Sequence, residues 1–265
     1  MISSRLTIIT STLNCASYLK QTAMSIREQN LTDFQWIIAD GGSSDETVKV
    51  IKDNIDIVSY WFSEFDTGIY DAWNKAINFI DGEWTLFLGA GDTLYSSDTL
   101  DICRTELKYV KEDYDFAFGN IKIHGKDKCY EIAHKGKFNP ILMDLNYSTP
   151  PHSSTFTRSL LLKNNRFDTR FKIIGDRKFM LLHSHGKYYN LEKNVTVMNG
   201  FGISNQVRNI PLIWNENILI FKDREIASIS HIPMVHVIKA FIANYRNIIL
   251  LKMVGEYNYA KWFTK

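Results

Sequence analysis

The first hundred residues alternate between short apolar runs and stretches in which apolar residues recur every third or fourth position. The runs predict four strands, at 6–9, 34–39, 57–62 and 84–88. The recurrent spacing predicts three helices, at 18–29, 45–51 and 70–80. Strands that alternate with helices through short connections pair in parallel, so this order predicts an α/β fold with a mostly parallel sheet flanked by helices.

The pattern beyond residue 90 is less regular. Residues 97–110 predict a helix and 116–123 a strand, and the stretch from 126 to about 199 is mixed. From Pro233 onward the apolar residues again fall on one helical stripe, which consists of Ile238, Phe241, Ile242, Tyr245 and Ile249. We therefore expect a C-terminal helical appendage behind the α/β part.

The composition fits a globular protein without a large charge bias. Of the 265 residues 45% are hydrophobic, and 31 basic against 29 acidic residues leave a formal net charge of +2. So small an excess does not favour nucleic acid as a partner. Three cysteines without a CxxC pair indicate neither a disulfide framework nor a zinc site. Because the N-terminus shows no secretion signal and no apolar run approaches the roughly 20 residues of a membrane span, we expect a cytoplasmic protein.

Two acidic loops that follow predicted strands are the strongest functional signal. One runs from Asp40 to Asp45 and contains Gly41 and Gly42, and the other ends at Asp92. Open α/β sheets bind their ligands at the carboxyl ends of parallel strands, where these loops are predicted to lie. A carboxylate in the first loop can accept hydrogen bonds from a base or ribose, and one in the second can hold a divalent cation against a pyrophosphate. The loops therefore predict a nucleotide-sugar site.

Each loop also has a purely structural interpretation. The first is compatible with a strand-to-helix turn in which Ser43 or Ser44 caps the helix, and Asp92 with an exposed aspartate in a glycine-rich turn. Thr12 and Asn14, after the first strand, have the groups either to touch a nucleotide or to cap a helix. The residue types leave these alternatives open.

The segment between the loops is rich in acids, aromatics and amides. It runs from Ser63 to Lys75 and enters the helix predicted at 70–80. Asp71 and Asn74 stand three positions apart and therefore on one helical face. Lys75 has the charge to meet a phosphate, although a solvated lysine is the more common arrangement.

Four motifs follow one another in this part of the chain: Thr12-Leu-Asn14, Ile37-Ile-Ala-Asp-Gly-Gly-Ser-Ser-Asp-Glu-Thr47, Ser63-Glu-Phe-Asp-Thr-Gly-Ile-Tyr-Asp-Ala-Trp-Asn-Lys-Ala76 and Phe87-Leu-Gly-Ala-Gly-Asp92. In this order and spacing they resemble the nucleotide-binding half of glycosyltransferase family 2, which has the Rossmann-like GT-A fold. A weaker match from His152 to Met180 resembles the family's acceptor-side segment. The bacterial members that the chain resembles build O-antigen, capsule or exopolysaccharide units on a lipid carrier.

The resemblance implies roles for individual residues. It makes Thr12 and Asn14 contacts to the nucleotide and Asp40 the carboxylate that recognises the base. It places Asp92 nearest the metal and the diphosphate, implies Mn²⁺ or Mg²⁺ as cofactor, and makes Asp176 the general base. Further substrate contacts are expected at Gly41, Ser43, Asp45, Asp66, Tyr70, Asp71, Asn74, Lys75 and His152.

The implied reaction is an in-line displacement at the anomeric carbon. Asp176 would take the proton of an acceptor hydroxyl while the metal stabilises the leaving nucleoside diphosphate, and the product would have inverted configuration. The donor is a nucleoside diphosphate sugar, with uridine preferred, although Asp40 could equally accept from guanine. The acceptor is a glycan linked to a polyprenyl diphosphate.

The metal loop departs from the family pattern. Gly89 and Gly91 occupy places where acids often stand, which leaves Asp92 as the carboxylate of this loop. The metal would then be ligated mostly by substrate phosphates, or by Asp66 or His152 in addition.

The segment around the predicted base departs as well. Arg177 and Lys178 follow Asp176 where an aromatic and an acid are common. Positive charge nearby would lower the pKa of Asp176 and weaken it as a base. The alternative role for Asp176 is an aspartate at a helix N-terminus, favoured by the helix dipole.

These expectations divide the chain into three parts. Residues 1–125 form the nucleotide-sugar-binding half, 126–205 the acceptor-side segment with the base, and 206–265 a helical region. The last part is basic and amphipathic, so it has the features either to lie on an anionic membrane surface or to pack on the catalytic domain.

Two other functions are compatible with parts of the pattern. A nucleotidyltransferase also uses an α/β sheet and a metal-binding aspartate, but it should carry a glycine-rich loop with a lysine after the first strand, and Thr10–Ala16 has neither. A non-catalytic nucleotide-sugar binder would explain a metal loop with few acids.

Overall fold

The computed structural model describes residues 5–124, 129–132, 150–185, 187–199, 202 and 206–223. The chain forms two compact units. The first contains Met1–Lys137, Pro150–Lys172 and Lys187–Gly200, and the second contains Phe138–Thr149, Ile173–Gly186 and Phe201–Lys265.

The first unit is built on one sheet, in which the described residues form nine strands. The strands are β1 (Leu6–Thr12), β2 (Phe34–Asp40), β3 (Tyr60–Ser63), β4 (Trp84–Phe87), β5 (Thr93–Leu94), β6 (Phe116–His124), β7 (Cys129–Ile132), β8 (Thr155–Arg158) and β9 (Tyr189–Asn199). Their order is β3-β2-β1-β4-β8-β6-β9-β5, and β7 pairs with β6. Strands β3, β2, β1 and β4 pair in parallel, whereas β8 runs antiparallel to both β4 and β6. The predicted α/β sheet is confirmed, and it continues beyond its parallel part as a mixed sheet.

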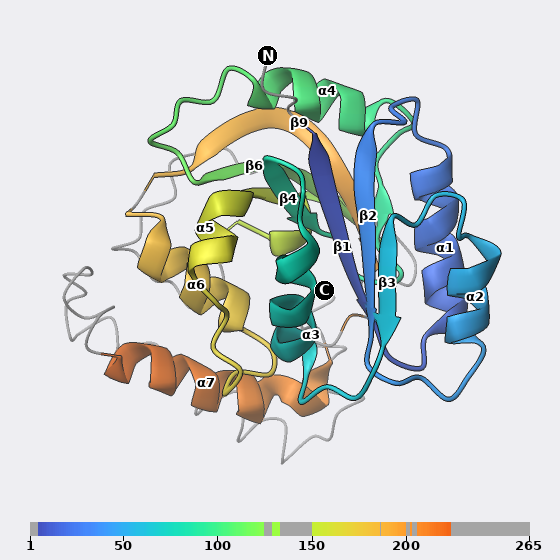
Figure 1. Ribbon diagram of the computed structural model, residues 1–265. Coiled ribbons are helices and arrows are strands. Elements are labelled where there is room, and N and C mark those ends of the chain that lie inside the picture. Colours follow the sequence, from blue (N-terminus) through green and yellow to red (C-terminus); the bar gives the residue numbers. More distant parts are fainter. Residues whose placement is uncertain are drawn as a thin grey trace. The chain divides into compact units, whose positions relative to one another are not determined.

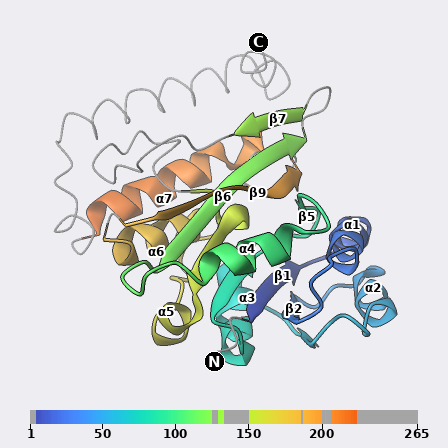
Figure 2. The ribbon, with the colours of Figure 1, turned by 90° about the horizontal axis from the view of Figure 1, so that it is seen from above.

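Helices cover both faces of the parallel strands. The helices of the first unit are α1 (Ala16–Arg27), α2 (Thr47–Asp53), α3 (Ile69–Ala76, extended by a 3-10 turn at Ile77–Phe79), α4 (Thr99–Leu107) and α5 (Ser159–Asn164), with a further 3-10 turn at His152–Ser154. Figures 1 and 2 show α3 on the opposite side of β1 and β2 from α1 and α2. The parallel strands are therefore buried on both faces, as their nearly continuous apolar runs require.

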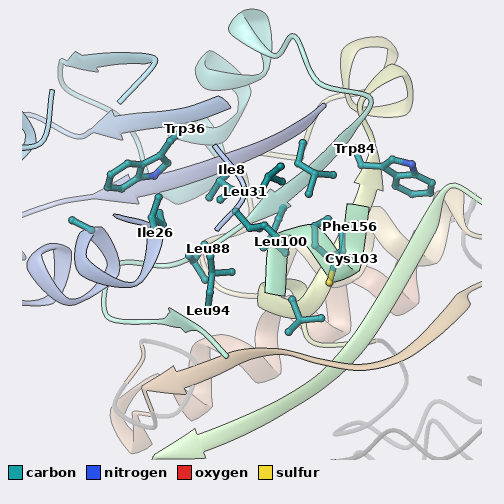
Figure 3. Packing of buried hydrophobic residues seen from close by; sticks show 14 of the residues in the cluster. Ile8, Ile26, Leu31, Trp36, Trp84, Leu88, Leu94, Leu100, Cys103 and Phe156 are labelled. Atoms are coloured by element: carbon teal, nitrogen blue, oxygen red, sulfur yellow. The ribbon is translucent and has the colours of Figure 1, made fainter. Parts of the chain in front are cut away.

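Alternate residues of the strands point to the two helical layers. Ile8 and Trp36 belong to one buried cluster with residues of α1, α2 and α4. On the other face, the Phe87 ring lies 4.3 Å from the ring of Trp73 in α3. Figure 3 shows Trp36 and Ile26 at one end of the cluster and Trp84 at the other. The period of two along each strand thus explains why one short run can serve both layers.

The structure adds strands that the sequence pattern did not reveal. Strand β9 contains interleaved polar residues, and its face pattern is irregular because its register against β6 shifts around Asn120. Strand β8 has four residues and directly follows a 3-10 turn. The sheet takes strands from both sides of residue 125, and the three-part division of the sequence stays a prediction. The helical stripe expected from Pro233 onward lies outside the described residues.

The second unit contains α6 (Gly175–His183), a 3-10 turn (Val207–Asn209) and α7 (Ile210–Lys222). Glu216 of α7 is buried, and its carboxylate accepts hydrogen bonds from the backbone N–H groups of Ile173 and Ile174, at 3.1 and 2.9 Å. The charge of Glu216 therefore fixes the start of α6. Among the helices described, none combines the length and the apolar character needed to cross a membrane.

Gly119 allows the close approach of β6 and β9. A Cβ atom at this position would meet Val195 Cγ2 and would lie 2.5 Å from the carbonyl oxygen of Lys193. We expect Gly119→Ala to lower the free energy of unfolding by about 2–3 kcal/mol, because backbone atoms cannot yield to the added methyl group. Urea denaturation measures this change. In Gly89→Ala, the matched control, the nearest atom is the movable carboxylate oxygen of Asp92 at 3.2 Å, so the loss should be clearly smaller. Equal stabilities of the two variants would contradict the prediction.

Candidate active site

The carboxylate of Asp40 joins the ends of three parallel strands. In the register of the sheet, Asp40 pairs with Thr12 of β1 and with Ser63 of β3. The side chain is 1% exposed and accepts hydrogen bonds from the hydroxyls of Thr12 and Ser63, at 2.9 and 2.6 Å. It also accepts from the backbone N–H groups of Gly42 and Ser43 and from the Ser43 hydroxyl. These donors hold the loop after β2 against both neighbouring strands.

The donors leave little room for a further partner of Asp40. A carboxylate offers about four lone-pair sites, and five donors already point at this one. Burial alone would raise the pKa of Asp40, but the hydrogen bonds from Ser43, Ser63 and Thr12 outweigh it, so the pKa lies below its ordinary value. The base contact expected of Asp40 stays a prediction, and the arrangement of the donors favours a role in shaping the loop.

Asn14, Ser43 and Asp45 tie the loops after β1 and β2 together. The Asn14 N–H donates to the Ser43 hydroxyl, and the Ser44 N–H donates to the Asn14 side-chain oxygen, both at 2.8 Å. Asp45 accepts from the N–H of Ala16 at the start of α1. It also accepts from the N–H of Thr47, at 2.9 Å.

These bonds decide between the capping alternatives. Glu46, and neither Ser43 nor Ser44, is the residue before α2, and its side chain makes no capping hydrogen bond. The interpretation of Ser43 or Ser44 as a helix cap is therefore wrong. Ser43 and Ser44 instead form hydrogen bonds with Asn14, in the loop after β1.

Asp66 lies against Gly41 at this edge. Its Oδ1 accepts from the Gly68 N–H at 2.9 Å, while Oδ2 would lie 2.5 Å from a Cβ at Gly41. The absent side chain at Gly41 is what leaves room for it. Burial raises the pKa of Asp66, and the negative charges of Asp71 and Asp40 add to the rise. The exposed side chains of Leu13 (56%) and Phe65 (81%) belong to the same edge.

The polar residues predicted on α3 hold backbone segments in place. Both ends of the Asn74 amide bond the backbone of Phe167, each at 2.9 Å. Asp71 accepts from the Thr67 N–H at 2.9 Å. Lys75 lies 2.8 Å from the carbonyl oxygen of Phe65, so it is not merely solvated.

Lys75 also pairs with an acid, since its Nζ lies 3.0 Å from Glu64. Asp71 and Lys75 thus support the segment that carries Asp66, whereas Asn74 holds the backbone of Phe167. The substrate contacts expected of these three α3 residues stay predictions.

Tyr70 and His152 belong to a buried aromatic cluster. Its members are Tyr70, Trp73, Phe87, His152 and Phe167. Tyr70 is 2% exposed and lies edge-on to Trp73 at 5.2 Å, and the His152 ring lies 5.4 Å from Trp73. Trp73 reaches the end of β1 through a hydrogen bond from its indole N–H to the Ser11 hydroxyl. The cluster therefore places His152 beside the strand ends.

Asp92 is buried with few donors. It is 8% exposed, so the interpretation as an exposed turn aspartate is wrong. Among the described residues, the backbone N–H of Asn199 donates to Oδ1 at 2.9 Å, and Oδ2 faces the position of Gly89, where a Cβ would lie 3.2 Å away. Burial raises the pKa of Asp92 to about 6, against the opposing effects of the Asn199 hydrogen bond and of nearby His152. Sequence reasoning missed Asn199, because 107 residues separate it from Asp92 and no local signal marks it.

This environment fits a divalent cation held jointly with a diphosphate. A buried carboxylate with one oxygen left without a donor gains from a cation, and Mg²⁺ and Mn²⁺ sites of this kind use few protein ligands. The described part of the chain contains no group of three His, Cys, Asp or Glu residues arranged to hold a metal by themselves. The charge of His152 lowers the pKa of Asp92, whereas no interaction links Asp66 to Asp92 in this part of the chain. The expectation that His152 or Asp66 helps to hold the metal stays a prediction.

Asp176 lies in the first turn of α6, in the second unit. The two cations that follow it are each 8% exposed, and their partners lie in α7 and just after its end. Arg177 donates to the Asn217 side chain at 3.1 Å, and Lys178 pairs with Asp223 at 2.8 Å. The expected effect of these two cations on the pKa of Asp176 stays a prediction.

Comparison with known proteins identifies the family. The sequence pattern of glycosyl transferase family 2 matches residues 7–180. This chain belongs to glycosyl transferase family 2. Within the family, a PGL/p-HBAD biosynthesis glycosyltransferase of Mycobacterium tuberculosis is 39% identical over 103 residues, which are 38% of this chain and 40% of the relative. A GalNAc(5)-diNAcBac-PP-undecaprenol beta-1,3-glucosyltransferase of Campylobacter jejuni is 27% identical over 63% of this chain and 56% of its own length. The matches thus span about two fifths to just over half of these relatives.

Solved structures share the fold. TarS of S. aureus, in complex with UDP, has a TM-score of 0.59 at 18% identity and covers 80% of this chain and 65% of its own. The mannosyltransferase PcManGT of Pyrobaculum calidifontis, in complex with GDP-Man and Mn²⁺, has a TM-score of 0.60 at 13% identity and covers 98% and 78%. The chain has the GT-A fold, as its motifs predicted.

Replacing Asp40 tests its role in shaping the loop. We expect Asp40→Asn to lower the free energy of unfolding at pH 7 by about 2 kcal/mol or more, because the amide NH₂ would face hydrogen-bond donors. The folded pKa of Asp40 is depressed, so its contribution is present above the unfolded value near 3.9 and is lost as the pH falls through the folded pKa. Urea unfolding should therefore show a difference between wild type and variant that shrinks below about pH 4. A difference that grows with acid would contradict the assignment.

Replacing Asp92 should have the opposite effect on stability. With EDTA present, we expect Asp92→Asn to be more stable than wild type at pH 7.5 by about 2 kcal/mol, because the buried charge is removed while the Asn199 N–H keeps an acceptor. The folded pKa of Asp92 is raised to about 6, so the cost of its charge is absent below the unfolded value near 3.9 and complete above pH 6. The gain should therefore vanish toward pH 4. Asp53→Asn, at an exposed carboxylate, is the control and should change little. A destabilised Asp92→Asn at pH 7.5 would overturn this account.

Proposed function

We propose that this protein is an inverting glycosyltransferase that moves a sugar from a nucleoside diphosphate donor, first of all a UDP-sugar, to a hydroxyl of a glycan acceptor. The observation that carries the proposal is the buried carboxylate of Asp92, which keeps one oxygen without a donor among the described residues. It follows β4, whereas the Asp40 and Asp66 loops follow β2 and β3, which are parallel to β4 in the same sheet, with β1 between β2 and β4. A cation and a nucleotide can therefore be recognised at one edge.

The residues of the first unit supply the donor site. Asp66 is our first choice for accepting hydrogen bonds from the base or ribose, because it is half-buried and, among the described residues, accepts a hydrogen bond only on Oδ1, from the Gly68 N–H. Thr12, Asn14, Ser43 and Asp45 contribute by fixing the loops, with exposed backbone groups as further contacts. When bound at Asp92, a divalent cation supplies positive charge for the departing diphosphate.

Asp176 is the proposed general base. Its carboxylate takes the proton of the acceptor hydroxyl as the oxygen forms a bond to the anomeric carbon. The bond from that carbon to the diphosphate oxygen breaks at the same time, and the diphosphate leaves with the electron pair. Attack from the face opposite the leaving group inverts the anomeric configuration. Glu216 holds the turn that precedes this residue.

The relatives support a glycan acceptor on a lipid carrier. The Campylobacter relative is named for an undecaprenyl diphosphate-linked acceptor, and the mycobacterial relative for PGL/p-HBAD biosynthesis. We propose an acceptor linked to a polyprenyl diphosphate and a role in bacterial surface-polysaccharide synthesis, such as O-antigen, on the inner face of the cytoplasmic membrane. The basic C-terminal stripe would supply the peripheral membrane contact. None of the comparisons supports the nucleotidyltransferase alternative.

Nucleotide titration and a single substitution test the proposal together. Calorimetric titration with UDP, GDP, dTDP and CMP, each with and without Mn²⁺, should show metal-enhanced binding of one nucleoside diphosphate, about tenfold or more tighter with the metal. Asp176→Asn should keep this binding and lose transfer activity by about 10²-fold or more, the usual contribution of a general base. Unchanged transfer by Asp176→Asn would remove it as the base. Absence of binding by every nucleotide would favour a protein without catalytic function.

A further inference from the structure

Three polar residues follow one another at helical spacing: Thr22 and Ser25 lie in α1, and Gln29 lies just beyond its C-terminal end. Thr22 is 0% and Gln29 7% exposed. Buried polar groups destabilise a fold unless they are hydrogen-bonded, so these residues require partners. Ser25 bonds the Thr22 carbonyl and Gln29 bonds the Ser25 carbonyl, and the other partners lie in one segment of the chain, residues 89–100, which follows β4 and contains Asp92.

Thr22 clamps the turn that presents Asp92. Its hydroxyl accepts from the Gly91 N–H at 2.9 Å and donates to the Asp92 carbonyl oxygen at 2.8 Å. Gly91 has a φ of 98°, a conformation that side-chain-bearing residues rarely adopt, so the turn is a specific one. A single side chain from another element therefore bonds the peptide group that follows the Asp92 Cα and the Ala90–Gly91 peptide group, which lies one peptide before the one that precedes it.

Ser25 and Gln29 continue the attachment along the segment. The Leu94 N–H donates to the Ser25 hydroxyl at 3.3 Å. The Gln29 amide donates to the Ser96 carbonyl at 2.7 Å and accepts from the Leu100 N–H at 3.1 Å. Beside this polar row, Ile26 belongs to the same buried cluster as Leu88, Leu94 and Leu100 (Figure 3).

The Asp92 side chain is fixed from a second direction, by the N–H of Asn199 on Oδ1. We propose that Thr22 is a positioning residue for the cation site: by bonding the Gly91 N–H and the Asp92 carbonyl, it sets where the Oδ2 oxygen of Asp92 lies. Ser25 and Gln29 keep the rest of the segment in register with α1. The inference rests on the proposed function. It implies that the effect of the cation on binding of the nucleotide donor depends on Thr22, a residue of α1 that does not itself contact the cation.

Thr22→Val tests the inference, because valine keeps the shape of threonine and removes the hydroxyl. We expect the enhancement of UDP binding by Mn²⁺ to fall by about tenfold, since two backbone groups lose their partner and the turn relaxes. Binding without Mn²⁺ should stay within about twofold, and Thr22→Ser should restore the enhancement. The measurement is calorimetric titration of the whole chain with UDP, with and without MnCl₂, or with whichever nucleoside diphosphate the wild type binds.

A matched control separates positioning from general loss of stability. Thr7 is equally buried, and its hydroxyl donates to Gln35 at 2.8 Å and accepts from the Gly82 N–H at 3.0 Å, at the other end of β1. Thr7→Val should therefore destabilise the fold but leave the Mn²⁺ enhancement unchanged. If Thr7→Val reduces the enhancement as much as Thr22→Val does, the positioning role is wrong.

A second readout does not depend on any bound metal. Amide hydrogen exchange in EDTA should show faster exchange of Gly91 and its neighbours in Thr22→Val than in wild type or in Thr7→Val. Should Thr22→Val fail to fold, Ser25→Ala takes its place, with faster exchange expected at Leu94. Unchanged exchange in the segment would overturn the inference even if the nucleotide binds as proposed. Loss of the Mn²⁺ effect in wild type, with the exchange pattern as expected, would instead count against the proposed function alone.

Discussion

The burial of the Asp40 carboxylate is the constraint on which the ligand-binding edge depends. A charge that is 1% exposed persists only where enough donors converge on it, and here they come from the ends of β1 and β3 and from the loop after β2. The three segments must keep their parallel register for all of these donors to reach the Asp40 carboxylate. One carboxylate therefore converts three separate loops into a single preformed surface, which is what binding without a large ordering cost requires.

Asp92 lies at the same edge, but its pKa is shifted in the opposite direction. Asp40 has more donors than lone pairs and a lowered pKa, whereas Asp92 is equally hidden from water, has one donor among the described residues and has a pKa raised to about 6. The first charge stabilises the fold, and the second costs stability until a cation compensates it. Surrounding structure holds this unfavourable charge in place, through Asn199 on the side chain and Thr22 on the backbone. An under-satisfied buried group of this kind is typical of a functional site.

The sequence predicted the parallel part of the fold because the signals there are local. Each strand from β1 to β4 is a compact apolar run, and each helix between them repeats its apolar residues within a few turns. Strand β9 carries no such signal, because its pairing with β6 and β5, and not its own alternation, makes it a strand. For the site residues, too, local signals could be read from the sequence and long-range contacts could not. Residue types placed carboxylates in both loops, but the types could not tell a cap from a ligand contact.

By itself the sequence determined the order of the elements, the two loops that end in carboxylates, and the resemblance of four motifs to a family of sugar-transferring enzymes. These properties depend on residues a few positions apart. Only the tertiary structure decided that Ser43 donates a hydrogen bond to Asp40 and that the Asn74 amide bonds the backbone of Phe167. It also decided that Asp92 is buried and accepts a hydrogen bond from the Asn199 N–H. The physical reason is that burial and hydrogen-bond saturation are set by segments that pack together from distant parts of the chain, and these two quantities determine whether a carboxylate stabilises the fold or remains open to a ligand.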